Sequence, residues 1–282
     1  MKEIVVISGK GGTGKTTITA SLAVLSRDAV LTDCDVDAAD LYLLLKPEKK
    51  QTFEFWGMKK AKINEEKCDK CGKCQELCRF GAISNFKVDP NFCEGCEVCY
   101  NLCPQKAIDM VDNLSGHWYI CDTKYGPMIY AKLGAAEENS GKLVAVVRKA
   151  AKEFVEREGY KSIITDGPPG IGCPVIASLS GADLALVVTE PTVSGIHDLE
   201  RVMRLAENFK LDVKVVINKY DLSEQISSDV QKYCRDKNIE IVGKIPFDEA
   251  VVKSISQGIP LVEYSDGPAA NAIKKMAKSI LD

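Results

Sequence analysis

The apolar positions of this chain change their spacing in regular alternation. Short apolar runs, typical of buried strands, alternate with stretches in which apolar residues recur every three to four positions, as on one face of a helix. Strands are expected at residues 3–8, 29–33, 118–121, 128–133, 161–165, 184–188, 213–217 and 240–245. Helices are expected at residues 15–27, 38–45, 142–158 and 269–281, with further helical segments between the later strands. Because alternating strands and helices form parallel βαβ units, the pattern predicts an α/β fold with a doubly wound, mostly parallel sheet.

The alternation breaks in the middle of the chain. Residues 46–62 are rich in lysine and aromatic side chains, cysteines dominate residues 68–103, and the strand and helix signals resume near His117. The sequence that begins at Ile63 repeats at Val88, with the cysteines in register at an offset of 25 residues. A segment this short buries too little apolar surface to fold alone, so something else must hold it together. We therefore predict a small α+β domain at residues 59–112, inserted into a main domain of residues 1–58 and 113–282.

Composition and charge narrow the class of protein. The 282 residues are 45% hydrophobic and 27% charged, as in an ordinary globular protein. A net charge of −3 gives no general attraction to nucleic acid, so no nucleic-acid partner is expected. No apolar run reaches the roughly 18 residues of a spanning helix, so no stable membrane insertion is expected. The chain passes from Met1 straight into a strand, which leaves no room for a signal peptide and predicts a cytoplasmic protein.

The twelve cysteines of the chain include two runs with the same spacing. Each run has three cysteines at every third position and a fourth one turn later, and the second run ends in Pro104 where the first has Arg79. Three such thiolates wrap three corners of a [4Fe–4S] cluster, whereas the fourth points away and ligates the other cluster. The predicted ligands are Cys68, Cys71, Cys74 and Cys103 for one cluster, and Cys93, Cys96, Cys99 and Cys78 for the other. A pair of zinc sites is the alternative, although zinc ribbons usually separate two C-x2-C pairs by a longer spacer.

This segment resembles bacterial-type ferredoxins over about fifty residues. The resemblance implies a ferredoxin-like domain with low-potential, one-electron chemistry. The lysines around the runs could form a basic rim for an acidic redox partner, or an ordinary solvated face. They are Lys59, Lys60, Lys62, Lys67, Lys70 and Lys73.

A glycine-rich phosphate loop follows the first predicted strand and opens a helix, the context that a P-loop requires. Its backbone N–H groups turn toward phosphate oxygens, helped by the helix N-terminus. Lys15 is expected to reach the β- and γ-phosphates, Thr16 to ligate Mg²⁺, and Thr17 to contact the α-phosphate. The predicted nucleotide-binding residues of the loop are Gly11, Gly12, Thr13, Gly14, Lys15, Thr16 and Thr17.

With its extra lysine, Lys10, the loop resembles that of the MinD/ParA/Mrp class of ATPases, which includes the nitrogenase iron protein. The resemblance covers about 230 residues outside the insert. It implies that Lys10 reaches across a homodimer interface to the partner's nucleotide, so that the ATP-bound form is a homodimer. It further implies that Asp35 positions the attacking water, that Asp33 lies near the metal, and that Asp166 holds Mg²⁺ through water. Asp33 and Asp35 have a simpler reading as turn and helix-cap residues.

The same resemblance identifies a base-binding region. Asn218, at the end of a predicted strand, looks like the adenine-contacting residue, and Pro246, Phe247 and Asp248 look like the loop that closes over the base. Asn218 also begins the sequence Asn-Lys-Tyr-Asp, which fits the N-K-x-D pattern of guanine-specific GTPases. ATP is predicted from the phosphate loop, and GTP is the alternative.

Four cysteines lie outside the runs. Cys34, Cys121 and Cys234 are expected to be small buried hydrophobic residues. Cys173 follows Asp166 at the distance of a cluster-bridging cysteine in the nitrogenase iron protein, but its counterpart would fall near Asn139, where no cysteine stands. A bridging cluster of that type is therefore not expected.

Three functions fit these features. The first is an ATPase in which ATP, Mg²⁺ and two [4Fe–4S] clusters couple nucleotide state to electron transfer toward a redox partner. The second is an ATP-dependent assembly or maturation factor for a client metalloprotein. The third is a MinD-like positioning ATPase.

Overall fold

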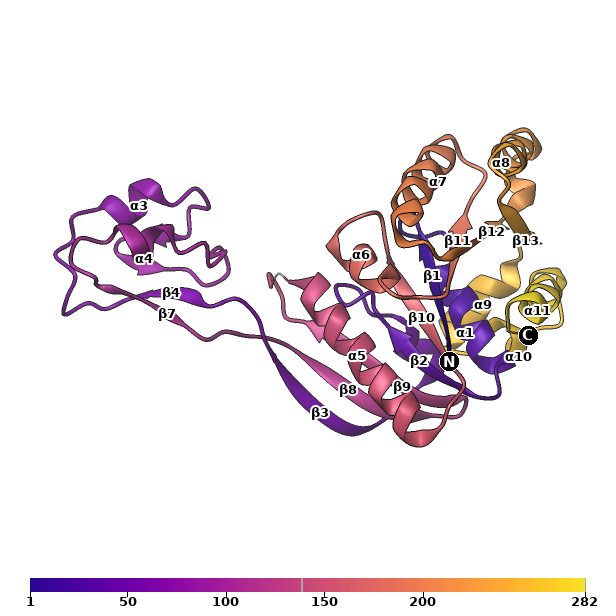
Figure 1. The fold of residues 1–282 in the computed structure, drawn as a ribbon, viewed down its shortest axis with the longest axis horizontal. Helices are drawn as coiled ribbons and strands as arrows, with labels where there is room; N and C mark the ends of the chain where they lie inside the picture. The colour runs from indigo at the N-terminus through magenta and orange to yellow at the C-terminus, as the bar shows by residue number, and fades with distance from the viewer. Residues whose placement is uncertain (138, 282) are drawn as a thin grey trace. The chain divides into compact units, whose positions relative to one another are not determined.

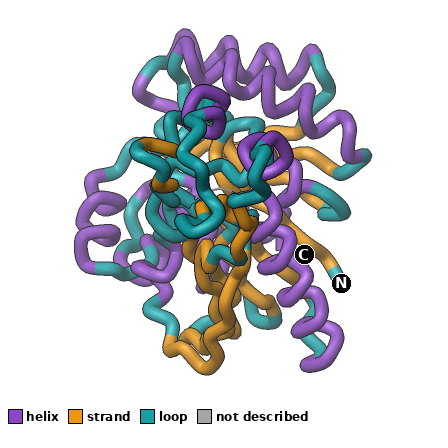
Figure 2. The backbone as a smooth tube through the Cα atoms, turned by 90° about the vertical axis from the view of Figure 1, so that its left-hand side faces the viewer, coloured by secondary structure: helices purple, strands orange, loops and turns teal. Residues whose placement is uncertain are grey.

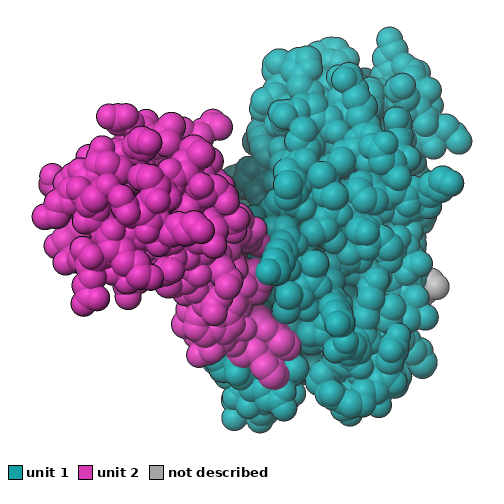
Figure 3. All heavy atoms as spheres, turned by 60° about the vertical axis from the view of Figure 1, so that its left-hand side comes forward, with its two compact units in different colours: residues 1–52, 119–131, 140–282 teal, residues 53–118, 132–139 magenta. Residues whose placement is uncertain are grey.

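A computed structural model describes residues 1–137 and 139–281. The chain divides into two compact units, which Figure 3 colours separately. The first comprises Met1–Thr52, Tyr119–Ala131 and Ser140–Asp282, and the second comprises Phe53–Trp118 and Lys132–Asn139.

A nine-stranded sheet runs through the first unit, in the order β13-β12-β11-β1-β10-β2-β9-β8-β3 (Figure 1). The seven strands from β13 to β9 are parallel to one another, each to its neighbour. This confirms the predicted α/β fold with a large, mostly parallel sheet. The strands are β1 (Lys2–Ser8), β2 (Ala29–Asp33), β3 (Glu48–Trp56), β8 (Leu114–Thr123), β9 (Gly126–Leu133), β10 (Ser162–Pro169), β11 (Leu184–Thr189), β12 (Asp212–Asn218) and β13 (Glu240–Ile245).

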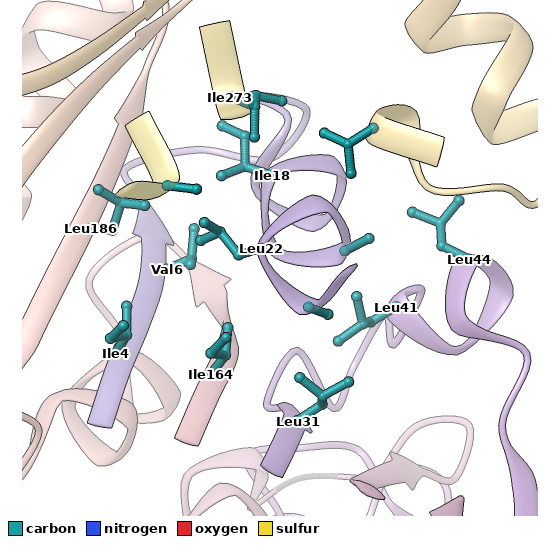
Figure 4. Close-up of a cluster of buried hydrophobic side chains, with 14 of the residues drawn as sticks. Ile4, Val6, Ile18, Leu22, Leu31, Leu41, Leu44, Ile164, Leu186 and Ile273 are labelled. Carbon is teal, nitrogen blue, oxygen red and sulfur yellow. The ribbon is translucent and has the colours of Figure 1, made fainter. Parts of the chain in front are cut away.

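Helices cover both faces of the sheet, because alternate side chains of a buried strand point to opposite faces. In β1, Ile4 and Val6 join one core cluster, and Val5 and Ile7 join the other. Figure 4 shows Ile18 and Leu22 of α1 among the side chains of the first cluster. The helices of this unit are α1 (Lys15–Leu25), α2 (Leu41–Leu45), α5 (Ser140–Glu158), α6 (Cys173–Leu179), α7 (Val193–Ala206), α8 (Glu224–Asp236), α9 (Glu249–Gln257), α10 (Leu261–Tyr264) and α11 (Pro268–Leu281), with 3-10 turns η1 (Glu207–Phe209) and η2 (Tyr220–Leu222).

The predicted strands and helices are confirmed, with shifted ends. The main difference is β3, which lies where the sequence showed only a lysine- and aromatic-rich stretch. Most of its residues are exposed, and it lies at the edge of the sheet beside β8. An exposed edge strand does not show the apolar alternation by which a half-buried strand is recognised.

The second unit consists largely of loops and turns (Figure 2). Two small antiparallel sheets and two single-turn helices lie within it. The elements are β4 (Lys60–Ile63) with β7 (Ile108–Val111), β5 (Ile83–Ser84) with β6 (Lys87–Val88), α3 (Lys73–Leu77) and α4 (Val98–Leu102). The sequence repeat is visible in the structure, because Ala82 and Ala107 are both 2% exposed and each precedes a buried isoleucine. The division of the chain into an insert at 59–112 and a main domain stays a prediction.

Candidate nucleotide and cluster sites

The phosphate loop connects β1 to α1. Gly14 directly precedes α1 with a φ of 91°, in the left-handed region that glycine adopts without steric cost. A Cβ atom at Gly14 would also lie 2.5 Å from the side-chain nitrogen of Asn218. Lys15, the first residue of α1, is buried. The loop therefore presents its backbone and Lys15 at the start of a helix, the arrangement that receives phosphate groups.

Asp166 lies in β10, beside β1, and two hydroxyl groups of α1 bind its carboxylate. Thr16 Oγ1 donates to Oδ2 at 2.6 Å, and Thr19 Oγ1 donates to Oδ1 at 3.0 Å. Burial raises the pKa of Asp166 to about 6, while the hydrogen bond from Thr16 and the charge of Lys15 oppose that rise. The structure thus brings together Thr16 and Asp166, two of the three residues expected near Mg²⁺.

Asp33 and Asp35 stand at the end of β2, where Asp33 is in register with Asp166. The carboxylate of Asp33 accepts hydrogen bonds from the backbone N–H groups of Asp35 and Leu41, each at 3.1 Å. These are the contacts of a residue that caps a turn, as the simpler interpretation of Asp33 predicts. Burial, and then repulsion by Asp166, raise the pKa of Asp33 well above its usual value. Burial also raises the pKa of Asp35, whereas Lys15 lowers it.

These carboxylates fit a magnesium ion through the chemistry of their oxygen atoms. In the described part of the chain, no three His, Cys, Asp or Glu side chains gather around a point that would hold a metal ion. Mg²⁺ usually takes one or two protein carboxylates and completes its octahedral shell with water and phosphate oxygens. The close pair of Thr16 and Asp166 suits that mode of binding.

A pocket of about 220 Å³ opens beside the phosphate loop. Asn218 fixes one wall, because its Nδ2 donates to the carbonyl oxygen of Thr13 at 2.8 Å. Apolar side chains of α9, α10 and α11 also line the pocket, and Phe247 of the predicted base loop is 51% exposed. The lining includes Gly12, Gly14, Thr17, Asn218, Pro246, Phe247 and Asp248. The structure therefore gathers the predicted base-binding residues around one pocket next to the phosphate loop.

Asp221, the last residue of the N-K-x-D pattern, binds the backbone of the predicted base loop. Its Oδ1 accepts the backbone N–H of Phe247 at 2.7 Å. Asp221 is not among the described residues that line the pocket. Asp248, in the same loop, caps α9 by accepting the N–H of Ala250 at 2.9 Å. The acidic residue that would bind guanine in a GTPase therefore accepts a hydrogen bond from the backbone of Phe247.

Lys10 is held by residues that follow β11. Its Nζ donates to Thr192 Oγ1 at 3.2 Å and to Ser194 Oγ at 3.3 Å, and lies 3.7 Å from Glu190 Oε2. Glu190 also accepts Lys219 Nζ at 2.8 Å. Glu190 was not predicted from the sequence, although it follows the buried strand β11 directly, at the same edge of the sheet as the aspartates.

The cysteines of the two runs meet in the second unit. The four ligands predicted for one cluster, Cys68, Cys71, Cys74 and Cys103, line a single pocket together with Cys99. Two backbone N–H groups donate to cysteine sulfurs, from Ala61 to Cys93 Sγ at 3.4 Å and from Ala107 to Cys103 Sγ at 3.3 Å. Such N–H···S bonds are usual around iron–sulfur clusters. Among the described residues, no three of these side chains are placed to hold a single metal ion, and the cross-ligation scheme stays a proposal.

Two groups of residues remain from the sequence, namely the lysines around the cysteine runs and the cysteines outside them. Lys60 does not belong to a basic rim, because its side chain is 11% exposed and paired with Glu137 at 2.8 Å. The lysine before it, Lys59, pairs with Asp112 at 3.4 Å. Outside the runs, Cys34, Cys121 and Cys234 are buried as expected, and Cys173 is exposed.

Comparison with known proteins agrees with this geometry. Residues 4–261 match the family described as the CobQ/CobB/MinD/ParA nucleotide binding domain. An uncharacterized protein of Methanocaldococcus jannaschii is 34% identical over 99% of this chain and 96% of its own length. The septum site-determining protein MinD of Bacillus subtilis is 23% identical over 99% of this chain and 88% of its own. The structure of MinD from Pyrococcus horikoshii with Mg-ADP superposes with a TM-score of 0.60 at 20% identity, covering 99% and 95% of the two chains.

The matched residues include the phosphate loop and nearly the whole parallel sheet. The chain belongs to the CobQ/CobB/MinD/ParA family of nucleotide-binding domains, within which it is a P-loop ATPase of the MinD/ParA type. In the described residues, no helix is both long and apolar enough to cross a membrane.

Proposed function

We propose that this chain is an ATP-hydrolysing iron–sulfur protein whose nucleotide state controls low-potential electron transfer from two [4Fe–4S] clusters to a partner protein. The pocket shared by the two cysteine runs carries the proposal. Cys103 comes from the second run, yet it lines this pocket with three cysteines of the first, as cross-ligation requires. Cys99, which is assigned to the other cluster, lines the pocket too. The second cluster takes Cys93, Cys96, Cys99 and Cys78, and both clusters lie in a ferredoxin-like domain at residues 59–112.

The clusters, when bound, supply one-electron redox chemistry. The chain itself provides the thiolates and the N–H groups that donate to them, from Ala61 and Ala107. Hydrogen bonds to the sulfurs stabilise the more negative, reduced state and so help to set the reduction potential.

At the nucleotide site, the loop N–H groups and Lys15 bind the phosphates, and Thr16 and Asp166 hold Mg²⁺. Hydrolysis of ATP needs little more than positioning and charge stabilisation. Asp35 orients a water molecule toward the γ-phosphorus, and the bond from that phosphorus to the bridging oxygen of ADP breaks as the new P–O bond forms. Lys10 of a second copy stabilises the charge that develops on the leaving oxygen, so the ATP-bound form is a homodimer.

The base pocket favours ATP over GTP. A guanine-reading aspartate must point its carboxylate at the base, whereas Asp221 accepts the N–H of Phe247. Asn218 and the loop of Pro246, Phe247 and Asp248 then contact an adenine.

Iron analysis tests the cluster assignment. Two clusters of four irons each require about eight iron atoms per chain after anaerobic purification. Four or fewer irons, or zinc in their place, would contradict the proposal.

A MinD-like positioning ATPase is the second candidate, and the family comparisons favour it specifically, since several similar proteins carry the name MinD. The C-terminal helix gives it no support, because the apolar face of α11 is buried. Sedimentation with anionic lipid vesicles separates the two functions: ATP-dependent binding to vesicles favours positioning.

An assembly factor for a client metalloprotein is the remaining alternative. Incubation of the iron-loaded protein with an apo acceptor distinguishes it. Rapid transfer of a cluster favours assembly, whereas stable clusters with an ATP-dependent reduction potential favour electron transfer.

A further inference from the structure

Lys10 and Lys219 share one carboxylate, that of Glu190. Glu190 directly follows β11, and its side chain is only 10% exposed. Its Oε1 lies 2.8 Å from Lys219 Nζ, and its Oε2 lies 3.7 Å from Lys10 Nζ. All three residues belong to the first unit. One negative charge therefore faces two ammonium groups, and Lys219 is the closer of the two.

The backbone around these side chains is fixed. Ser8 Oγ donates to the carbonyl oxygen of Lys10 at 2.6 Å. The N–H of Thr192 donates to the carbonyl oxygen of Glu190 at 2.8 Å, and a Cβ atom at Gly195 would collide with that same oxygen. The side chain of Lys10, in contrast, is 32% exposed and has a flexible four-carbon stem. Lys10 can therefore leave Glu190 by rotation of its own side chain.

Two further contacts of Lys10 come from the start of α7. Its Nζ donates to Thr192 Oγ1 at 3.2 Å and to Ser194 Oγ at 3.3 Å. Thr192 caps α7, and its Oγ1 also accepts the N–H of Gly195 at 3.0 Å. The N-terminus of a helix carries a partial positive charge, which disfavours a cation. Two hydroxyl groups at that end are a poor site for an ammonium group, so the charge of Glu190 is what keeps Lys10 there.

Lys219 determines how easily Lys10 leaves. A nearly buried carboxylate that loses its cation is strongly destabilised, because its charge is then neither paired nor well hydrated. Glu190 keeps Lys219 at 2.8 Å after Lys10 has left, so its charge stays compensated. The backbone N–H of Lys219 also donates to Asn218 Oδ1 at 3.0 Å. Lys219 is therefore the permanent partner of Glu190, and Lys10 is the partner that exchanges.

We propose that Glu190 is a positioning residue that holds Lys10 in its own chain until ATP-bound chains pair, and that Lys219 makes this release possible. This role rests on the proposed function, in which Lys10 acts on the nucleotide of a second copy. The phosphates of that nucleotide and Glu190 then compete for the same ammonium group. A triphosphate offers Lys10 more negative charge than one shared carboxylate does, so Lys10 moves to the second copy only when ATP is bound there.

Two variants with opposite expected effects test this role. Glu190→Gln keeps the shape of the side chain and removes its charge. With a saturating non-hydrolysable ATP analogue and Mg²⁺, it should lower the dissociation constant of the dimer about five-fold, as expected for the loss of a partly exposed ion pair. Lys219→Gln leaves the charge of Glu190 to Lys10, so it should raise the dissociation constant by a similar factor. Sedimentation velocity over a range of protein concentrations measures both.

An ion pair elsewhere in the first unit provides matched controls. Lys214 of β12 lies 3.1 Å from Glu240 of β13, so Lys214→Gln and Glu240→Gln remove the same kinds of charge and should dimerise as wild type. Because Lys219 also lines the base pocket, calorimetric titration of each variant establishes the analogue concentration that saturates it. A dimer that does not strengthen in Glu190→Gln, or does not weaken in Lys219→Gln, would overturn this role of Glu190.

Acetylation of lysines, followed by mass spectrometry, reports on Lys10 without any dimer. In the nucleotide-free protein, Lys10 should react several-fold faster in Glu190→Gln than in wild type, relative to the exposed Lys278. The reason is that the carboxylate no longer holds its amino group away from the reagent. Equal rates would show that Glu190 does not hold Lys10. Wild-type chains that stay monomeric with the analogue would instead refute the proposed homodimer, and the acetylation rates would still decide whether Glu190 holds Lys10.

Discussion

At the nucleotide site the three predicted aspartates have different surroundings. Asp166 is bound by hydroxyl groups of α1, Asp33 caps a turn, and Asp35 is only partly buried. Their residue types and their places after strands were readable from the sequence. Their partners were not, because Thr16 and Asp166 are 150 residues apart in the chain.

The raised pKa of Asp166 predicts a pH dependence of stability. Its pKa of about 6 in the folded protein exceeds the ordinary value of 3.8, so the folded state binds more protons between these pH values. The contribution of this group to stability is present at low pH and is lost as pH rises through about 6, amounting to about 3 kcal/mol at most. Thermal unfolding without nucleotide should therefore depend less steeply on pH between 4.5 and 7 in Asp166→Asn. Equal slopes in wild type and variant would contradict the assignment, and Asp236→Asn, at an exposed site, is the control.

The contact of Asp221 predicts how base selection responds to mutation. Asp221→Ala removes the acceptor of the Phe247 N–H, which should cost about 1 kcal/mol and weaken ATP binding roughly five-fold. The ratio of ATP to GTP affinity should stay as in wild type, because this carboxylate does not read the base. Calorimetric titration with both nucleotides measures the ratio, with Asp236→Ala as the control. A selective loss of GTP binding would instead identify Asp221 as a guanine-reading residue.

Among the elements, buried strands were predictable and exposed ones were not. β1 and β11 are almost entirely buried, and their apolar runs stand out. β3 is mostly exposed and is stabilised by pairing with β8, a contact between segments far apart in sequence. The pattern of apolar and polar residues within one segment does not indicate with which distant strand that segment pairs.

In the second unit, the proposed cross-ligation predicts which cysteines share a cluster, and double variants test it. If Cys68 and Cys103 ligate the same cluster, Cys68→Ser with Cys103→Ser should lose about four irons, as each single variant does. Cys93→Ser with Cys103→Ser should lose about eight, because it removes a ligand from each cluster. Iron and acid-labile sulfide analysis after anaerobic purification measures both. The reverse result would show that each run holds its own cluster.

For the whole molecule, the proposed function predicts that Lys15 and Lys10 have different roles, one in nucleotide binding and the other in hydrolysis and dimer formation. Lys15→Ala should abolish nucleotide binding, because this buried lysine at the start of α1 is proposed to bind the phosphates. Lys10→Ala should leave binding intact and remove hydrolysis and dimer formation, because in the proposed function Lys10 acts on the nucleotide of the second copy.

Light scattering after size-exclusion chromatography, with and without a non-hydrolysable ATP analogue, reports the dimer, and phosphate release reports hydrolysis. Normal hydrolysis by Lys10→Ala would show that this lysine has no part in the reaction. Lys10 contacts Thr192 and Ser194 and lies 3.7 Å from Glu190 Oε2. Glu190→Gln removes the charge that holds Lys10 there, so this variant should favour the dimer.

The sequence by itself determined the parallel α/β class, the phosphate loop and the two cysteine runs, because each depends on the spacing of residues that are close together in the chain. Apolar period, glycine placement and the three-residue interval of the thiols are properties of neighbouring positions. Tertiary structure alone decided which side chains meet across the chain. It placed Asp221 against the backbone of Phe247, Glu190 against Lys10, and Glu137 against Lys60. Such contacts join segments that only the folded sheet and the compact second unit bring together, and a single sequence carries no signal of that proximity.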